Sequence, residues 1–110
     1  MFISMAILAA GLGVTACGRH PTVLQTDQTG RYAAAVALYE NNGCISCHGN
    51  NLQGGVGPSL QHVGTQLTAA EIHHRIEAGA GPMPGYGPGY QAILTNAQID
   101  TLTAWLTAQQ

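Results

Sequence analysis

The chain has 110 residues, enough for one domain, and only 7% of them are charged. Lysine is absent and the net charge is −2, which argues against a nucleic-acid partner, because such proteins present clustered basic residues. Fifteen glycines and five prolines indicate long loops, and so small a chain has difficulty burying enough apolar surface by itself.

An apolar run opens the chain and ends at a cysteine. Residues 2–14 are almost all apolar or small, and this run is too short to cross a bilayer as a helix, which needs about 20 residues. Its length is typical of the apolar region of a secretory signal, although no Lys or Arg precedes it. The run leads into Val14-Thr15-Ala16-Cys17, which resembles a bacterial lipobox. We expect residues 1–16 to be a lipoprotein signal peptide and Cys17 to carry lipid. The alternative is an ordinary signal peptide, with Cys17 removed or left as a free thiol.

A polar segment follows the lipobox. Residues 18–29 contain Pro21 with several Thr and Gln, and they show no helical apolar stripe. This composition is typical of a flexible tether. The sequence therefore predicts a signal peptide over residues 1–16, a lipid-anchored tether over 17–30 and a domain over 31–110. Either kind of signal places the domain outside the cytoplasm, and the lipid would anchor it to the outer face of the cell membrane.

The first helix of the domain is predicted over residues 31–42. Tyr32, Val36 and Tyr39 recur at steps of three and four residues, with alanines between them. Asn41-Asn42-Gly43 then breaks the pattern, so the helix is expected to end there.

The segment Cys44-Ile45-Ser46-Cys47-His48 is the most specific pattern in the chain. Two thiols three positions apart, followed directly by an imidazole, fit covalent attachment of a c-type haem. Each thiol can form a thioether with one haem vinyl group, and the imidazole can bind the iron as proximal ligand. A structural zinc site would normally need a second ligand pair, and a thioredoxin-like site needs a preceding strand. An unligated structural pair would leave His48 unexplained. The pattern predicts one haem c with its iron.

Two further helices are predicted from their start signals. Thr68 and Glu71 form the capping-box pattern that begins a helix, and Gly79 is expected to end that helix. Thr95 and Gln98 repeat the pattern before a closing helix, whose apolar stripe continues toward the end of the chain. The apolar faces of these two helices are predicted to contain Ile72, Ile76, Ile99, Leu102, Trp105 and Leu106.

A methionine lies in the second of two expected loops. Residues 49–66 and 80–90 are rich in Gly and Pro and are expected to be mostly loop. Met83 is flanked by two prolines in the second loop, and it is the one methionine that would remain after signal cleavage. A thioether is a soft, neutral ligand that favours reduced iron, so Met83 is the candidate sixth ligand. The alternative is a methionine that lies on the surface or fills the core. The rival ligands are the histidines His62, His73 and His74.

Together these segments resemble a small class I cytochrome c over about residues 31–110. The likeness rests on the first helix, the haem motif, a segment beside the proximal histidine, the methionine loop and the last helix. The lipobox narrows it to the small lipid-anchored cytochromes c of Gram-positive bacteria. Ala35 departs from the pattern, because the family often has Gly where the first and last helices cross. The segments that carry the resemblance are residues 35–39, 44–49, 57–60, 81–84 and 99–105.

The resemblance implies an all-α fold, with about three main helices around a covalently bound haem. It implies that Cys44 and Cys47 hold the haem and that His48 and Met83 bind its iron. It also implies that the far nitrogen of the His48 ring donates to the carbonyl of Pro58, which would fix the orientation of the ring. The alternative for Pro58 is a simple turn proline.

Two aromatic residues complete the expected site. Tyr86, just after the methionine, is a candidate to pack on the haem or to bond a propionate; the alternative is a solvated loop residue. Trp105 is expected to pack against Tyr39 and the first helix, which is a structural role.

The resemblance implies a one-electron carrier of a respiratory chain and not an enzyme. The expected partners are membrane redox complexes, with a quinol-oxidising complex or dehydrogenase as donor and a terminal oxidase as acceptor; we expect a monomer. The absence of lysine argues against docking through a ring of lysines, so a small apolar contact is expected. The lipid anchor would raise the effective concentration of the carrier near its membrane partners. The alternatives are a haem subunit of a dehydrogenase, a haem peroxidase and a haem-based sensor. The last two need an open iron position, against which Met83 argues.

Overall fold

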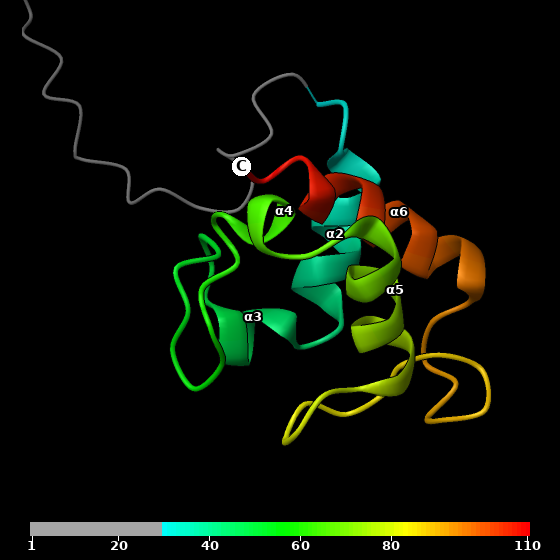
Figure 1. Cartoon of the computed structure of the whole chain (residues 1–110). Helices are drawn as coiled ribbons and strands as arrows, with labels where there is room; N and C mark the ends of the chain where they lie inside the picture. The colour runs from blue at the N-terminus through cyan, green and yellow to red at the C-terminus, as the bar shows by residue number, and fades with distance from the viewer. Residues whose placement is uncertain (1–29) are drawn as a thin grey trace, which may run out of the picture.

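The computed structural model describes residues 30–110, and these residues contain helices and no strand (Figure 1). The expected all-α fold is confirmed, and its three longest helices are α2 (Ala33–Asn41), α5 (Ala69–Ala78) and α6 (Asn96–Thr107). No helix within the described range is long and apolar enough to cross a membrane. The signal peptide, the lipid on Cys17 and most of the tether lie outside this range. The helices are α2 (Ala33–Asn41), α3 (Cys44–His48), α4 (Val63–Gln66), α5 (Ala69–Ala78) and α6 (Asn96–Thr107).

Both predicted capping boxes are confirmed, and they explain where α5 and α6 begin. The backbone N–H of Glu71 donates to the Thr68 hydroxyl at 3.2 Å, and the Thr68 N–H donates to the Glu71 carboxylate at 2.8 Å. Thr95 and Gln98 make the same pair of bonds at 3.2 and 2.9 Å. These bonds satisfy N–H groups that have no partner inside the first turn of a helix.

One boundary differs from the sequence prediction: the first helix is shorter than the predicted 31–42. Residues 49–66 are mostly loop, as expected, and the short helix α4 forms at their end. Gly64 in α4 packs directly on the end of α6. Its N–H donates to the Gln109 carbonyl at 2.7 Å, and a Cβ at this position would collide with the Thr107 carbonyl oxygen. This short helix therefore depends on a contact with a segment distant in the sequence, which local composition does not reveal.

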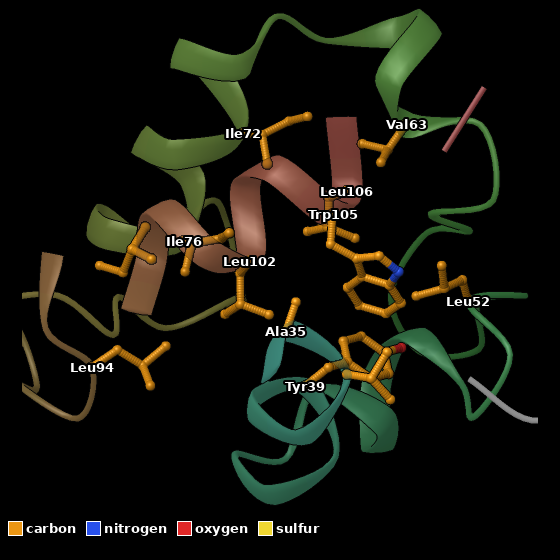
Figure 2. Packing of buried hydrophobic residues seen from close by; sticks show 12 residues of the cluster. Ala35, Tyr39, Leu52, Val63, Ile72, Ile76, Leu94, Leu102, Trp105 and Leu106 are labelled. Atoms are coloured by element: carbon orange, nitrogen blue, oxygen red, sulfur yellow. The ribbon is translucent and has the colours of Figure 1, made fainter. Parts of the chain in front are cut away.

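The core is built around α6, on which α2, α4 and α5 all pack (Figure 2). Ala35 is 1% exposed on the face of α2 that meets α6, so a methyl group fits at this crossing. The expected packing of Trp105 on Tyr39 is confirmed: the ring centroids are 5.4 Å apart, and the rings meet edge to face at 74°. The buried apolar residues are Ala35, Val36, Tyr39, Leu52, Val63, Ile72, Ile76, Leu94, Ile99, Leu102, Trp105 and Leu106.

Candidate functional site

The two cysteines of the motif lie on α3, a helix of five residues. Residues three positions apart lie on the same side of a helix, so both thiols face the same region. Cys44 is half-buried and Cys47 is exposed, and neither is in a disulfide. Burial raises the pKa of the Cys44 thiol above its ordinary value. His48 follows directly and is buried, with 8% of its surface exposed. The helix thus presents two thiols and an imidazole within one and a half turns.

A cavity of about 490 Å³ lies between α3, α5 and the loop that carries Met83. This volume falls in the range of about 300–1,000 Å³ that is usual for cofactor and ligand pockets. All five helices and the loops 56–60 and 80–86 contribute to its walls. Most of the wall is apolar: Val56, Leu60, Val63, Leu67, Ile72, Ile76, Leu94, Leu102 and Leu106. The predicted site residues within the described range all line this cavity: Cys44, Cys47, His48, Pro58, Met83 and Tyr86.

The His48 ring is held by the loop that follows α3. Its Nδ1 lies 2.9 Å from the carbonyl oxygen of Pro58. A carbonyl can only accept, so Nδ1 carries the proton, and the lone pair of Nε2 remains for another partner. Gly57 makes this approach possible, because a Cβ at that position would lie 3.1 Å from Cε1 of the ring. The loop therefore sets both the tautomer and the orientation of His48.

Met83 is presented by a tight turn just after α5. The N–H of Ala80 donates to the Met83 carbonyl at 3.1 Å, and the N–H of Met83 donates to the Ala80 carbonyl at 3.0 Å. Gly79 ends α5 with φ +85°, a conformation that glycine adopts readily. A Cβ on Gly79 would lie 2.5 Å from the Met83 carbonyl oxygen, so glycine also allows the turn to fold back closely. Met83 itself is half-buried against the core.

Tyr86 follows Met83 by three positions in the same loop and is half-buried at the cavity wall. Its N–H donates to the Ile76 carbonyl at 2.9 Å, and its carbonyl accepts from Ile93 and Leu94 at 3.0 and 2.9 Å. Burial raises the pKa of the Tyr86 phenol above its ordinary value. The phenol therefore stays neutral and protonated, and it is a hydrogen-bond donor at the cavity wall.

The other described histidines lie away from the cavity. His62 is exposed, and its Nδ1 is 2.8 Å from the Gln110 carbonyl oxygen. His73 lies 3.1 Å from a carboxylate oxygen of Asp100 and 3.5 Å from one of Glu77. His74 is exposed on α5. None of the three lines the cavity, so His48 is the one imidazole among its described walls.

Sequence reasoning did not single out two cavity residues, Arg75 and Tyr39. Arg75 is the one Asp, Glu, Lys or Arg side chain among the described cavity walls. It follows Ile72 by three positions, and this spacing on α5 was the available signal that the two share a face. Arginine at an apolar wall suits a ligand that carries carboxylates. The sequence predicts that Tyr39 packs against Trp105, and the structure shows that it also lines the cavity.

The lining groups can be compared with the groups that different cofactors require. Within residues 30–110, no cluster of three or more His, Cys, Asp or Glu side chains is placed to hold a metal ion directly. Two thiols, an oriented imidazole, a thioether, apolar walls and one arginine instead fit a flat, largely apolar group that carries its own iron and carboxylates. The donor set therefore matches haem c.

Comparisons with known proteins agree with this chemistry. A family model described as cytochrome C oxidase, cbb3-type, subunit III, matches residues 30–106. Cytochrome c-550 of Bacillus subtilis is 35% identical over 75 residues, which cover 68% of this chain and 57% of that protein. Cytochrome c-551 of the same organism is 28% identical over 113 residues, covering 98% and 95% of the two chains.

A menaquinol:cytochrome c reductase cytochrome c subunit of Geobacillus thermodenitrificans is 53% identical over 53 residues. Those residues are 48% of this chain but only 20% of the reductase subunit, so the chain corresponds to a small part of that protein. The family match, the helical fold and the donor set of the cavity agree, and the chain belongs to the cytochrome c family of electron carriers, with covalently attached haem c.

Proposed function

We propose that this protein carries single electrons between membrane redox complexes outside the cytoplasm. In this proposal Cys44 and Cys47 would hold the haem, and His48 and Met83 would bind its iron. The observation that carries the proposal is the His48 ring, whose Nδ1 is bound to Pro58 and whose Nε2 is free, in the same cavity as a thioether. A cavity that holds both an imidazole and a thioether donor favours electron transfer over reactions that need an open iron position.

The cavity residues have distinct tasks in this mechanism. Bound haem supplies a one-electron couple between Fe(III) and Fe(II). The Pro58 carbonyl keeps the proton on Nδ1 of His48, so that the lone pair of Nε2 points away from the loop as a ligand. The turn between Ala80 and Met83 holds the thioether donor, which favours the reduced state. The apolar walls exclude water, which keeps solvent reorganisation small when the charge changes, and Arg75 and Tyr86 are available to the carboxylates.

The expected partners come from the relatives. The name of the Geobacillus relative describes a menaquinol:cytochrome c reductase. We therefore propose a quinol-oxidising complex or dehydrogenase as the electron donor. The proposed acceptor, a terminal oxidase, rests on the resemblance to the cytochrome c family alone. A lipid on Cys17 would hold a monomeric domain at the outer face of the membrane. Such tethering raises the effective concentration of the carrier at its partners.

The rim of the cavity supports an apolar docking contact. Val56 is 91% exposed at this rim, and Cys47 is exposed beside it. Arg75 is the one charged wall residue within the described range. Contacts of this kind depend weakly on ionic strength, whereas docking through rings of charge depends on it strongly.

The test uses the haem-loaded protein and membranes that contain the quinol-oxidising complex. Reduction by quinol should be rapid, should change little between low and high salt, and should slow several-fold in Val56→Asp but not in Tyr90→Phe. The oxidised protein should show a sulfur-to-iron charge-transfer band. Fast turnover of hydrogen peroxide would instead indicate a peroxidase, and rapid binding of carbon monoxide to the reduced wild type would indicate a sensor.

The similarity to a reductase subunit also supports a second candidate, a haem subunit bound permanently to a dehydrogenase or quinol-oxidising complex. The two candidates differ in the form in which detergent extracts the protein from the membrane. A mobile carrier should be extracted by mild detergent as a monomer. Co-elution with a larger complex at a fixed ratio, in low and in high salt, would favour the subunit.

A further inference from the structure

The hydroxyl group of Tyr39 makes a hydrogen bond that the proposed electron transfer does not yet explain. Tyr39 lies on α2, is 1% exposed and lines the cavity. Its hydroxyl donates to the carbonyl oxygen of Gly49 at 2.5 Å. Gly49 directly follows His48 at the end of α3. A core aromatic residue thus binds the backbone beside the proposed iron ligand.

We propose that Tyr39 is a positioning residue for His48: its hydroxyl ties the end of α3 to the packed α2–α6 core and so fixes the place of the imidazole in the cavity. This inference rests on the proposed role of His48 as an axial ligand. It assigns to Tyr39 a task beyond filling the core.

The Tyr39 ring is immobilised, so its hydroxyl is a fixed anchor. The ring meets the indole of Trp105 edge to face, with centroids 5.4 Å apart, and Trp105 is fully buried in α6 (Figure 2). A ring wedged between two helices cannot swing to another acceptor without breaking this packing. Movement of the Gly49 carbonyl would therefore cost the hydrogen bond.

The backbone at the end of α3 needs such an anchor. Gly49 has φ +85° and ψ 159°, a conformation that is open to glycine and that turns the chain sharply out of the helix. The other hydrogen bonds of this end lead to α3 itself or to the following loop. They run from Gly49 N to Ile45 O at 2.9 Å, from Gly54 N to His48 O at 2.8 Å, from Gly57 N to Cys47 O at 2.8 Å, and from His48 Nδ1 to Pro58 O at 2.9 Å. Among these bonds of the described residues, the one from Tyr39 connects His48 and its neighbour to another helix.

Burial, the largest effect, raises the pKa of the Tyr39 phenol above its ordinary value. The phenol is therefore protonated at neutral pH, and its hydroxyl is available as the donor to Gly49.

The experiment compares the haem-loaded wild type with Tyr39→Phe, which keeps the ring and removes the hydroxyl. Tyr90→Phe is the matched control, because Tyr90 is 55% exposed in a loop. We expect amide hydrogen exchange at Gly49 and Gly54 in Tyr39→Phe to rise on the order of threefold to tenfold relative to amides of α6, as the loss of one hydrogen bond predicts. The hyperfine shifts of the His48 ring protons and the midpoint potential should also change. The control should change neither.

A purely structural role would give a different result. Exchange would then accelerate equally at α3 and α6, while the His48 shifts and the potential stayed at wild-type values, and the inference would be wrong. If Tyr39→Phe fails to accumulate, the wild type decides: a slowly exchanging hydroxyl proton with a cross-peak to Gly49 supports the tether, and its absence refutes it. Absence of hyperfine-shifted His48 signals in the wild type would instead refute the proposed ligation, whatever the exchange data show.

Discussion

Nδ1 of His48 lies 2.9 Å from the carbonyl oxygen of Pro58, ten residues later in the chain. This contact connects the haem-binding motif to the loop that forms one wall of the cavity. It leaves the lone pair of Nε2 available to bind a metal ion. Gly57 allows it, because any side chain there would press on the ring. The orientation of His48, the proposed proximal ligand, is therefore set by a loop and not by the five-residue helix on which it lies.

Haem attachment should depend on both thiols of α3. We expect Cys44→Ala combined with Cys47→Ala to give no covalent haem and an unfolded, degraded chain. The reason is that a cavity of about 490 Å³ with mostly apolar walls would lose the group that packs against it. Haem staining after denaturing electrophoresis is the measurement, with Ser46→Ala as the control. A stained band from the double variant would disprove the assignment.

Met83 should control the redox properties more than the fold. We expect Met83→Ala to retain covalent haem, to lose its low-spin character and to have a lower midpoint potential, because a thioether stabilises Fe(II) relative to harder donors. Weak peroxidase activity should appear. Absorption spectra and voltammetry measure these changes, and Val56→Ala, which alters the rim but no donor, should leave both unchanged. A six-coordinate low-spin spectrum with an unchanged potential in Met83→Ala would show that another residue is the ligand.

Trp105 should be among the most costly core residues to truncate. It is fully buried between α6 and α2 and packs edge to face on Tyr39. We expect Trp105→Ala to lower the free energy of unfolding by about 3–5 kcal/mol, since it removes a large buried aromatic side chain. Denaturant unfolding of the haem-loaded protein is the measurement. Tyr90→Ala, at an exposed position, should change stability by no more than about 0.5 kcal/mol. Similar losses in the two variants would contradict the prediction.

The two capping boxes should differ in their response to acid. The pKa of Glu71 lies below its ordinary value, chiefly because the Thr68 N–H donates to the carboxylate and also because of the Thr68 hydroxyl. Its contribution to stability is therefore fully present above the ordinary pKa, and it is lost as the pH falls through the lowered folded value. Gln98 occupies the same place in α6 without a charge.

The capping boxes of α5 and α6 allow opposite substitutions that serve as controls for each other. We expect Glu71→Gln to lose less stability than the wild type between about pH 7 and about pH 3, and Gln98→Glu to lose more. Denaturant unfolding at several pH values measures both. Parallel pH profiles for the wild type and the two variants would rule out a role of the charge in the cap.

Membrane attachment should depend on Cys17, which lies outside the described residues. We expect the mature chain to start at Cys17 and to carry acyl chains, and Cys17→Ser to be released or to remain unprocessed. Intact mass of the purified protein and its distribution between membrane and soluble fractions are the measurements. A mass equal to that of an unmodified chain plus haem would exclude lipidation.

Several features of the fold and site follow from residues close together in the sequence. The positions of Cys44, Cys47 and His48 in one short segment predict the cofactor, because thioether formation and ligation need only that spacing. The starts of α5 and α6 were predicted correctly, because a capping box is a local exchange of hydrogen bonds over three residues. The spacing of apolar residues likewise predicted which face of α6 is buried, since helical periodicity is a local property.

Other features were decided only by contacts between distant segments. The helix α4 forms where Gly64 meets the end of α6, and no pattern within residues 49–66 indicates it. The packing of whole helices places Arg75 at the cavity wall. It also places His62 away from the cavity, beside Gln110. The hydroxyl of Tyr39 donates to the Gly49 carbonyl only because α2 packs on α6, which holds the Tyr39 ring against Trp105. Local spacing determined which cofactor this chain can bind covalently. Tertiary packing determined which side chains surround that cofactor, because burial brings together groups that the sequence separates.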